Sequence, residues 1–299
     1  MTHVATLISN PARPAVVTAL VDAARAELPG AGKPQWLAQN IAADIPFTPP
    51  TATSDRAMAG MLRERFPDSI DVVVQPAADR RKTLFLADMD STMIGQECID
   101  ELADLVNLKK HVAAITERAM RGEIAFEPAL RERVSLLKGL PAAVIDEVIR
   151  DRIRVTAGAR ALVMTMRANG AYTCLVSGGF KSFTDRIAAM IGFDENRSNI
   201  LEISTDGTLS GLVREPIFGR DAKLATLLDL RRQRGIAREA TLVTGDGAND
   251  LSMIQEAGLG VAYHAKPALA EAAHARIDHS DLTALLYAQG YKKEEFVEA

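Results

Sequence analysis

Short apolar runs alternate with helical patterns in the C-terminal two thirds of the chain. Continuous apolar runs at 83–87, 171–176 and 240–243 predict buried strands, because a strand covered on both faces carries apolar residues without alternation. Apolar residues recur at helical spacing over 159–168 and 221–232. Buried strands that alternate with helices predict an α/β fold, a Rossmann-like parallel sheet with helices on both faces.

One stretch interrupts this alternation. Residues 97–155 carry helical patterns only, which predicts a helical cap inserted over about 93–155. The α/β domain would then span 81–299, with its core formed by 81–92 and 156–299.

The first 80 residues have a different pattern, because nine of the 13 prolines lie there. Apolar runs predict strands at 4–8 and 70–74, and helical spacing predicts helices at 16–24 and 57–66. A third strand is expected within 36–41, before the breakers Pro46, Pro49 and Pro50. The pattern predicts a small α+β module over 1–80, β-α-β-α-β with room for one more strand, and a linker at 76–81.

Composition narrows the class of protein. The chain has 299 residues, 47% of them apolar and 25% charged, with a net charge of −4. This predicts a folded, soluble protein of about two domains and argues against a nucleic-acid or membrane binder. The longest stretch without charged residues, 168–180, is too short to span a bilayer, and no signal-peptide pattern opens the chain. Two cysteines in no ligand spacing favour a reducing compartment, so we expect a cytoplasmic protein.

Polar clusters follow the predicted strands. Asp88 and Asp90 come directly after the first one, and a carboxylate there can attack phosphorus while a second transfers protons. Taken alone, the pair is more typical of a helix N-cap with Asx-turn residues. Ser177 and Gly178 follow the second strand and could bind phosphate oxygens, although an ordinary turn has the same composition. Lys223 could neutralise phosphate charge, but most helix lysines are simply solvated.

The third strand leads into the loop Gly245-Asp246-Gly247-Ala248-Asn249-Asp250. Its oxygen-bearing side chains suit Mg²⁺, and the alternative is an acidic turn. The joint order of Asp-x-Asp, Ser, Lys and an acidic loop, each at the end of a strand or the start of a helix, favours a single site for phosphoryl transfer.

These ordered motifs resemble those of the haloacid dehalogenase superfamily. The resemblance is closer to the phosphoserine phosphatase family and covers about residues 83–287, including Glu97 and the insert segments 116–123, 126–127 and 130–137. The superfamily motifs imply Mg²⁺-dependent phosphoryl transfer, and the insert implies phosphoserine as the substrate.

The resemblance also implies a role for each residue. It makes Asp88 the nucleophile and Asp90 the general acid/base. The residues implied to hold Mg²⁺ are Asp88, the Asp90 backbone carbonyl and Asp246, with Asp250 supporting the metal loop. The implied phosphate-binding residues are Ser177, Gly178, Lys223 and Asn249. In the cap, Glu97 would bind the substrate ammonium and Arg133 its carboxylate, while Met120 and Phe126 would close over the substrate.

The implied reaction is hydrolysis of O-phospho-L-serine to L-serine and phosphate through an aspartyl-phosphate, the last step of serine biosynthesis. One alternative is a phosphatase or phosphotransferase of the same superfamily acting on another small phosphomonoester. A receiver-like signalling protein also places carboxylates and Lys at strand ends, but the Asp-x-Asp pair and the cap argue against it. Residues 1–80 resemble an ACT-like module in their element order only, which leaves open a role in homodimer assembly or in binding an amino-acid effector.

Overall fold

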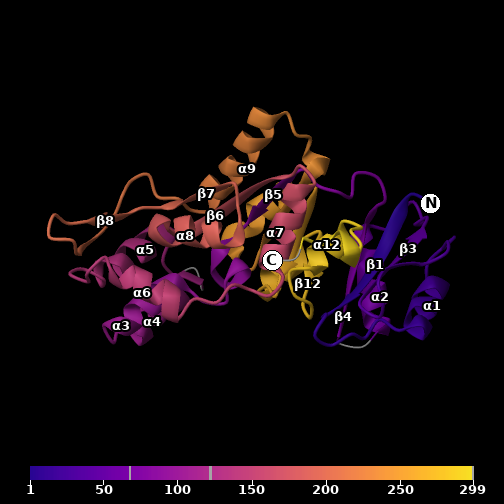
Figure 1. Cartoon of the computed structure of the whole chain (residues 1–299), viewed down its shortest axis with the longest axis horizontal. Coiled ribbons are helices and arrows are strands. Elements are labelled where there is room, and N and C mark those ends of the chain that lie inside the picture. Colours follow the sequence, from indigo (N-terminus) through magenta and orange to yellow (C-terminus); the bar gives the residue numbers. More distant parts are fainter. Residues whose placement is uncertain (67–68, 121–122, 298–299) are drawn as a thin grey trace.

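A six-stranded parallel sheet with helices on both faces forms the centre of the molecule (Figure 1). This computed structural model describes residues 1–66, 69–120 and 123–297. The strand order is β12-β11-β10-β5-β6-β7. These strands are β5 (Leu84–Ala87), β6 (Tyr172–Phe180), β7 (Glu195–Asn199), β10 (Thr241–Gly245), β11 (Leu259–Tyr263) and β12 (Ala275–Ile277). The predicted α/β class is confirmed.

Successive residues of the central strands enter two different apolar cores. On β5, Phe85 and Ala87 pack into one core, and Leu84 and Leu86 pack into the other. The helices on the first side are α7 (Ala159–Ala168), α8 (Lys181–Ile191) and α12 (Ala284–Ala288), and those on the second are α9 (Arg220–Arg234), α10 (Leu251–Glu256) and α11 (Pro267–Ala272). Burial on both faces explains why the strands are continuously apolar.

A helical insert leaves the sheet after β5. Its helices are α3 (Cys98–Leu105), α4 (Lys109–Met120), α5 (Phe126–Ser135) and α6 (Val144–Asp151). An antiparallel bridge between Ile94 and Val155 joins the two ends of the insert. A hairpin that the sequence pattern did not predict, β8 (Leu201–Ile203) and β9 (Leu209–Val213), extends from the core along this insert (Figure 1).

The N-terminal module is a four-stranded antiparallel sheet with order β2-β3-β1-β4. Its elements are β1 (His3–Ser9), α1 (Thr18–Glu27), β2 (Gln35–Ala38), β3 (Ala42–Phe47), α2 (Asp55–Arg65) and β4 (Ile70–Pro76). This βαββαβ order is the split-βαβ arrangement of ferredoxin-like folds. Strand β3 is the further strand for which the pattern left room, and it includes Pro46, which the sequence reading treated as a breaker.

The position of Pro46 explains why a strand tolerates it. The Pro46 carbonyl accepts a hydrogen bond from the Gly32 N–H, beyond the last β2–β3 pair at Gln35 and Asp44. In a strand, the N–H and the carbonyl of one residue point to the same side. The nitrogen of Pro46 therefore faces the β2 side beyond the last β2–β3 pair, where the lack of an N–H removes no hydrogen bond between paired residues of the two strands.

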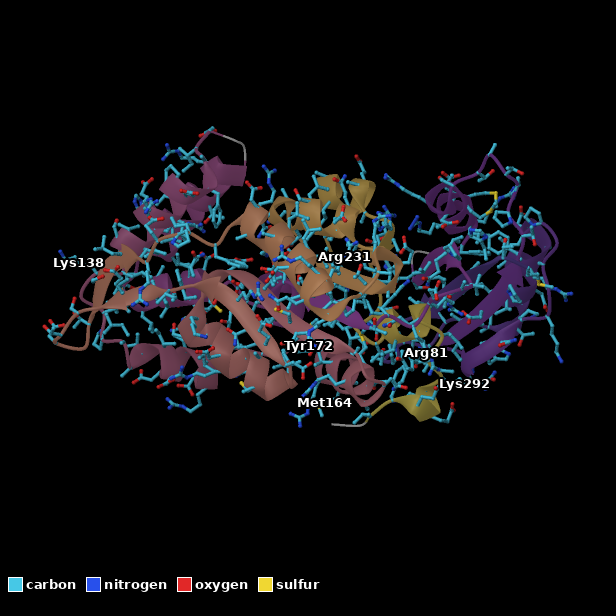
Figure 2. All side chains as sticks on the ribbon, turned by 90° about the horizontal axis from the view of Figure 1, so that it is seen from above. Arg81, Lys138, Met164, Tyr172, Arg231 and Lys292 are labelled. Carbon is cyan, nitrogen blue, oxygen red and sulfur yellow. The ribbon has the colours of Figure 1, made fainter. Side chains whose placement is uncertain are left out.

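The module packs one sheet face on its own helices and the other on the α/β core. Ile8 and Val73 share an apolar cluster with Leu285, whereas Leu7 and Val72 belong to a separate cluster under α1 and α2. At the junction, Figure 2 shows Arg81 between the N-terminal module and the C-terminal helices. The predicted linker, residues 76–81, is therefore part of a packed joint between the N-terminal module and the α/β core. Among the described residues, no helix has both the length and the apolar character needed to cross a membrane.

Candidate active site

The polar residues that follow β5, β6 and β10 meet at the carboxyl edge of the sheet. The Asp88 N–H donates to the Thr244 carbonyl over 3.0 Å, which ties the ends of β5 and β10 together. Strand β6 continues through the Ser-Gly-Gly segment, with a bulge between Ser177 and Phe180. The Gly179 N–H donates to Ser177 Oγ over 2.8 Å and closes this bulge. Two of the predicted phosphate-binding residues, Ser177 and Gly178, therefore lie on a bulge within β6 rather than after the strand.

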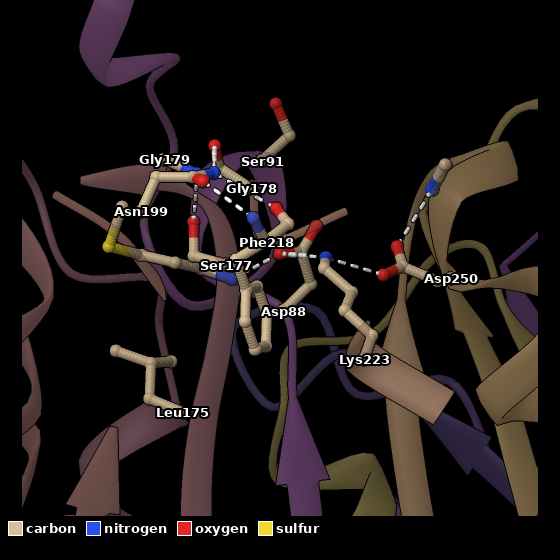
Figure 3. A network of polar contacts seen from close by, with 12 residues as sticks. Asp88, Ser91, Leu175, Ser177, Gly178, Gly179, Asn199, Phe218, Lys223 and Asp250 are labelled. Carbon is tan, nitrogen blue, oxygen red and sulfur yellow. Dashed lines mark hydrogen bonds and ion pairs between the residues drawn. The ribbon is translucent and has the colours of Figure 1, made fainter. Parts of the chain in front are cut away.

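A buried lysine joins two carboxylates at this edge. Lys223 Nζ lies 2.6 Å from Asp88 Oδ1 and 2.8 Å from Asp250 Oδ1, as the dashed lines in Figure 3 show. The Lys223 side chain is fully buried. Burial alone would lower the pKa of Lys223, but the charges of Asp250 and Asp88 outweigh it, so its pKa is raised and the ammonium stays charged.

Three carboxylates crowd around this ammonium. Oxygen atoms of Asp88, Asp246 and Asp250 lie within 4.8 Å of one another. Burial, followed by the charge of Asp250, raises the pKa of Asp246 to about 6 and also raises the pKa of Asp88. Lys223 is paired with Asp88 and Asp250, and the charge of Lys266 acts on Asp246, so the cluster places three carboxylates beside two ammonium groups. Buried oxygen donors with excess negative charge fit a divalent cation such as Mg²⁺.

Asp90 lies on the other side of this cluster, toward the β6 bulge. Asp90 Oδ1 accepts a hydrogen bond from the Cys98 N–H over 3.1 Å. Its Oδ2 lies 3.0 Å from the point that a Cβ on Gly179 would occupy. Burial, together with the charge of Glu97, raises the pKa of Asp90 to about 7. The carboxyl group can therefore carry a proton near neutral pH, as a general acid requires.

The insert closes over the bulge. The ring of Phe126 lies above both Gly178 and Gly219, where an added Cβ would come within 3.3 Å and 3.2 Å of ring atoms. Glycine at these two positions lets the ring approach the backbone. The Phe126 ring therefore shields this end of the site from water.

Two charged residues of the cap segment lie near Asp90. Burial lowers the pKa of Arg133, and the nearby carboxylates, Glu97 among them, oppose this effect. The Arg133 guanidinium donates to Thr116 Oγ1 and to the Ala129 carbonyl, over 3.1 Å and 3.2 Å. Glu97 is exposed, and its Oε1 accepts a hydrogen bond from Ser91 Oγ over 2.7 Å. An acid and a base therefore lie at the cap side of the site.

Two predicted residues contribute less to the described geometry. Asn249 Oδ1 lies 2.5 Å from the point that a Cβ on Gly247 would occupy, so the Asn249 side chain faces its own loop. The side chain of Met120 lies outside the described part of the structure. The metal-binding role of the Asp90 carbonyl stays a prediction, because the described cluster consists of side-chain oxygens only.

The sequence reading missed one buried polar residue beside the bulge. Asn199 ends β7, is 2% exposed and bonds to the Gly178 carbonyl (Figure 3). No motif surrounds Asn199 in the sequence, so only the packing of β7 against β6 shows it.

Comparisons with known proteins agree with this geometry. Residues 85–255 match the family described as haloacid dehalogenase-like hydrolase. A phosphoserine phosphatase from Polaromonas sp. is 50% identical over 208 residues, which cover 68% of this chain and 88% of that protein. The match includes most of the length of that relative.

Two solved structures are similar to different extents of the chain. A HAD family hydrolase from Salmonella enterica serovar Typhi has a TM-score of 0.85 at 29% identity, covering 98% of this chain and 99% of that one. A substrate-bound phosphoserine phosphatase has a TM-score of 0.65 at 39% identity, covering 69% of this chain and 97% of that one. The first similarity therefore includes the N-terminal module, which shows that the arrangement of all three parts recurs.

Proposed function

The chain belongs to the haloacid dehalogenase-like hydrolase family, and we propose that it hydrolyses O-phospho-L-serine to L-serine and phosphate with Mg²⁺. One observation supports this proposal above the others. Asp88 and Asp90 face the β6 bulge from a site that holds one buried ammonium, and a cap with Glu97 and Arg133 lies over it.

The proposed first step is an in-line attack by an Asp88 carboxylate oxygen on phosphorus. The new Asp88–phosphorus bond forms as the bond from phosphorus to the seryl oxygen breaks, and protonated Asp90 gives its proton to that oxygen. The hydrogen bonds from Lys223 Nζ and the Met89 N–H hold the Asp88 carboxylate in one orientation. This positioning lowers the entropic part of the barrier.

The second step returns the enzyme to its starting state. Asp90, now ionised, takes a proton from water, which attacks phosphorus as the bond to Asp88 breaks. Phosphate leaves, and Asp90 is protonated again. Lys223 balances charge throughout, because it is buried between Asp88 and Asp250.

The residues that would hold Mg²⁺ are Asp88, the Asp90 backbone carbonyl and Asp246, while Asp250 supports the metal loop. A bound Mg²⁺ would supply positive charge to the phosphate oxygens in both steps. The Gly247 N–H donates to Asp250 Oδ2 over 3.2 Å, which fixes the loop in a conformation where its carboxylates converge.

The cap accounts for the choice of phosphoserine. This substrate carries an ammonium and a carboxylate besides its phosphate, and Glu97 and Arg133 are the complementary pair on the cap side. A guanidinium can bind a carboxylate with two parallel hydrogen bonds. Serine biosynthesis and a cytoplasmic location follow from the proposed substrate and remain parts of this proposal.

The test is release of inorganic phosphate from O-phospho-L-serine by the full chain, with Mg²⁺ and with a chelator. We expect turnover that the chelator abolishes and that added Mg²⁺ restores. A panel of other phosphomonoesters, with and without an acceptor alcohol, is run in parallel. Faster turnover of another ester, or transfer to the alcohol, would contradict the proposed substrate or the hydrolytic outcome.

A further inference from the structure

The side chain of Asn199 has all of its described hydrogen bonds with backbone groups on two separate segments. Asn199 Nδ2 donates to the Gly178 carbonyl over 2.8 Å and to the Phe218 carbonyl over 2.9 Å. Asn199 Oδ1 accepts from the Phe218 N–H over 2.6 Å. Figure 3 shows Asn199 between these two backbones, and its side chain is almost fully buried.

The two segments hold the groups that would bind the phosphate. Gly178 follows Ser177 on the β6 bulge. Phe218 comes directly before Gly219, the N-cap of α9, and Lys223 lies near the start of that helix. Asn199 therefore links the bulge to the start of the helix that carries the buried ammonium.

The same residue closes the base of the β8–β9 hairpin. The chain leaves the core after Asn199 and returns at Phe218, and the two opposed hydrogen bonds between these residues join the ends of the excursion. The hairpin is thus anchored to the core at one place.

The far end of the β8–β9 hairpin is attached to the cap. The Gly139 N–H donates to the Leu209 carbonyl over 2.9 Å, the Leu209 N–H donates to the Leu140 carbonyl over 2.7 Å, and the Ala142 N–H donates to the Gly207 carbonyl over 2.9 Å. Lys138, labelled at one end of the molecule in Figure 2, packs against the same hairpin. A displacement of the cap would therefore pull on the hairpin, whose base lies beside the phosphate-binding segments.

We propose that Asn199 is a positioning residue, which keeps the Ser177–Gly178 bulge and the Lys223 helix at a fixed spacing for phosphate. This inference rests on the proposed function for the identity of the anion. Asn suits the position because two N–H donors meet two carbonyls and one oxygen meets an N–H. An aliphatic residue would leave these buried groups unpaired, and a carboxylate would face two carbonyl oxygens.

The experiment compares two asparagines of the same strand. Asn199→Ala removes the bridge, and Asn196→Ala removes hydrogen bonds to Thr184 and Asp185 on the outer side of β7. For both variants of the full chain, kcat and KM for O-phospho-L-serine, inhibition by inorganic phosphate and thermal unfolding are measured. A misplacement of about 1 Å costs about 100-fold in rate, so we expect kcat/KM of Asn199→Ala to fall by about 10- to 100-fold. Its inhibition constant for phosphate should rise, while Asn196→Ala stays within about 2-fold of wild type in both.

A lower unfolding temperature with unchanged phosphate inhibition in Asn199→Ala would overturn the inference, because it would mean a structural role only. If that variant does not fold, Asn199→Asp replaces it. The aspartate keeps the acceptor for the Phe218 N–H and loses both donors, so its phosphate inhibition should weaken as well. Wild-type inhibition in a folded Asn199→Asp variant would also overturn the inference.

The outcomes separate this inference from the proposed function. If the wild type prefers another phosphomonoester, the proposed substrate is wrong, while the comparison of Asn199 and Asn196 is still decided by phosphate inhibition. If the wild type neither turns over a phosphomonoester nor binds phosphate, both proposals fail.

Discussion

Two clusters of acidic side chains, one at the catalytic edge and one at the joint with the N-terminal module, have opposite surroundings. At the catalytic edge, Asp88, Asp246 and Asp250 crowd together. At the joint with the N-terminal module, Asp71 lies close enough to Asp278 and His279 that a cation could in principle bind between them. Each cluster contains at least one buried carboxylate, Asp71 in one and Asp88 in the other.

Their hydrogen-bond donors distinguish them. Both oxygens of Asp71 accept from backbone N–H groups, with Asp278 at 2.7 Å, Ser280 at 2.8 Å and His279 at 3.2 and 3.3 Å. These donors already compensate the Asp71 charge. At the catalytic edge, burial, followed by the charge of Asp250, raises the pKa values of Asp88 and Asp246. A buried carboxylate therefore indicates a ligand site when its own fold leaves its charge uncompensated.

The arginines show the same contrast. Arg80, from the predicted linker, bonds to both oxygens of Asp44 over 2.7 and 3.1 Å and to the Ala288 carbonyl over 3.0 Å. Arg133 at the cap bonds to a hydroxyl and a carbonyl oxygen, which are neutral. The arginine at the joint forms an ion pair within the fold, and the one at the cap forms none among the described ion pairs, which supports the proposal that it binds the substrate carboxylate.

The largest effect is expected for Asp88→Asn. Loss of the nucleophile should lower kcat by at least about 10³-fold. The amide oxygen of Asn can still accept a hydrogen bond from Lys223 Nζ, so we expect the variant to remain folded. Phosphate release and thermal unfolding of the same preparation check both statements. Wild-type turnover would exclude Asp88 as the nucleophile.

At the joint, Asp71→Ala is expected to lower the stability of the fold and leave kcat nearly unchanged. Three backbone N–H groups lose a charged acceptor, which should destabilise the fold by about 3 kcal/mol. Below the unfolding transition, kcat should stay within about 2-fold of wild type. Urea unfolding followed by a kinetic assay of the folded enzyme tests this. A large loss of kcat without a loss of stability would show that the joint acts on the catalytic edge and would remove the contrast.

The sequence predicted the catalytic edge better than the joint, for a physical reason. Asp88 and Asp246 each follow a buried apolar strand, and Ser177 lies near the end of another. Parallel strands end at a common edge, so local patterns place these residues together. Asp71 and Ser280 are far apart in the chain, and no local pattern indicates that they meet.

Local sequence patterns also fail to predict the strands that form only because of tertiary contacts. Strand β3 contains Asp44 and Pro46, which disfavour strands locally, and it forms because β1 and β2 pair with it on both sides. The β8–β9 hairpin has one face on the cap, so its pattern depends on residues distant in sequence. Asn199 lies at its base, and its role becomes visible only with the fold.

A smaller effect is expected for Arg133→Ala. If this guanidinium binds the substrate carboxylate, kcat/KM for O-phospho-L-serine should fall by about 10- to 100-fold, the value of a charge-assisted pair. Turnover of an aryl phosphate, which has no such carboxylate, should change by less than about 3-fold. Arg150→Ala is the control, since Arg150 is an exposed cap residue paired with Asp151, and a surface pair of this kind contributes little. Equal losses on both substrates would mean that Arg133 does not bind the carboxylate.

The smallest effect is expected for Ser91→Gly, which separates stability from selectivity at a single residue. Ser91 has a φ of 54°, in the left-handed region where glycine is favoured, and its hydroxyl holds Glu97. The glycine variant should be as stable as wild type or more stable, by up to about 1 kcal/mol, because it removes backbone strain. It should also lose a few-fold in kcat/KM for O-phospho-L-serine, since a freed Glu97 would bind the ammonium less well.

The matched variant comes from the N-terminal module. Asn40 has a φ of 59°, and its side chain accepts only from neighbouring Gln39 among the described hydrogen bonds. Asn40→Gly should change stability in the same direction and leave selectivity between phosphoserine and an aryl phosphate unchanged. If both variants change stability alone, the Ser91 hydroxyl has no part in selectivity, and the strain at Ser91 is only a feature of the turn. A selectivity change confined to Ser91→Gly would show that strain at the catalytic edge is kept because the hydroxyl acts on Glu97.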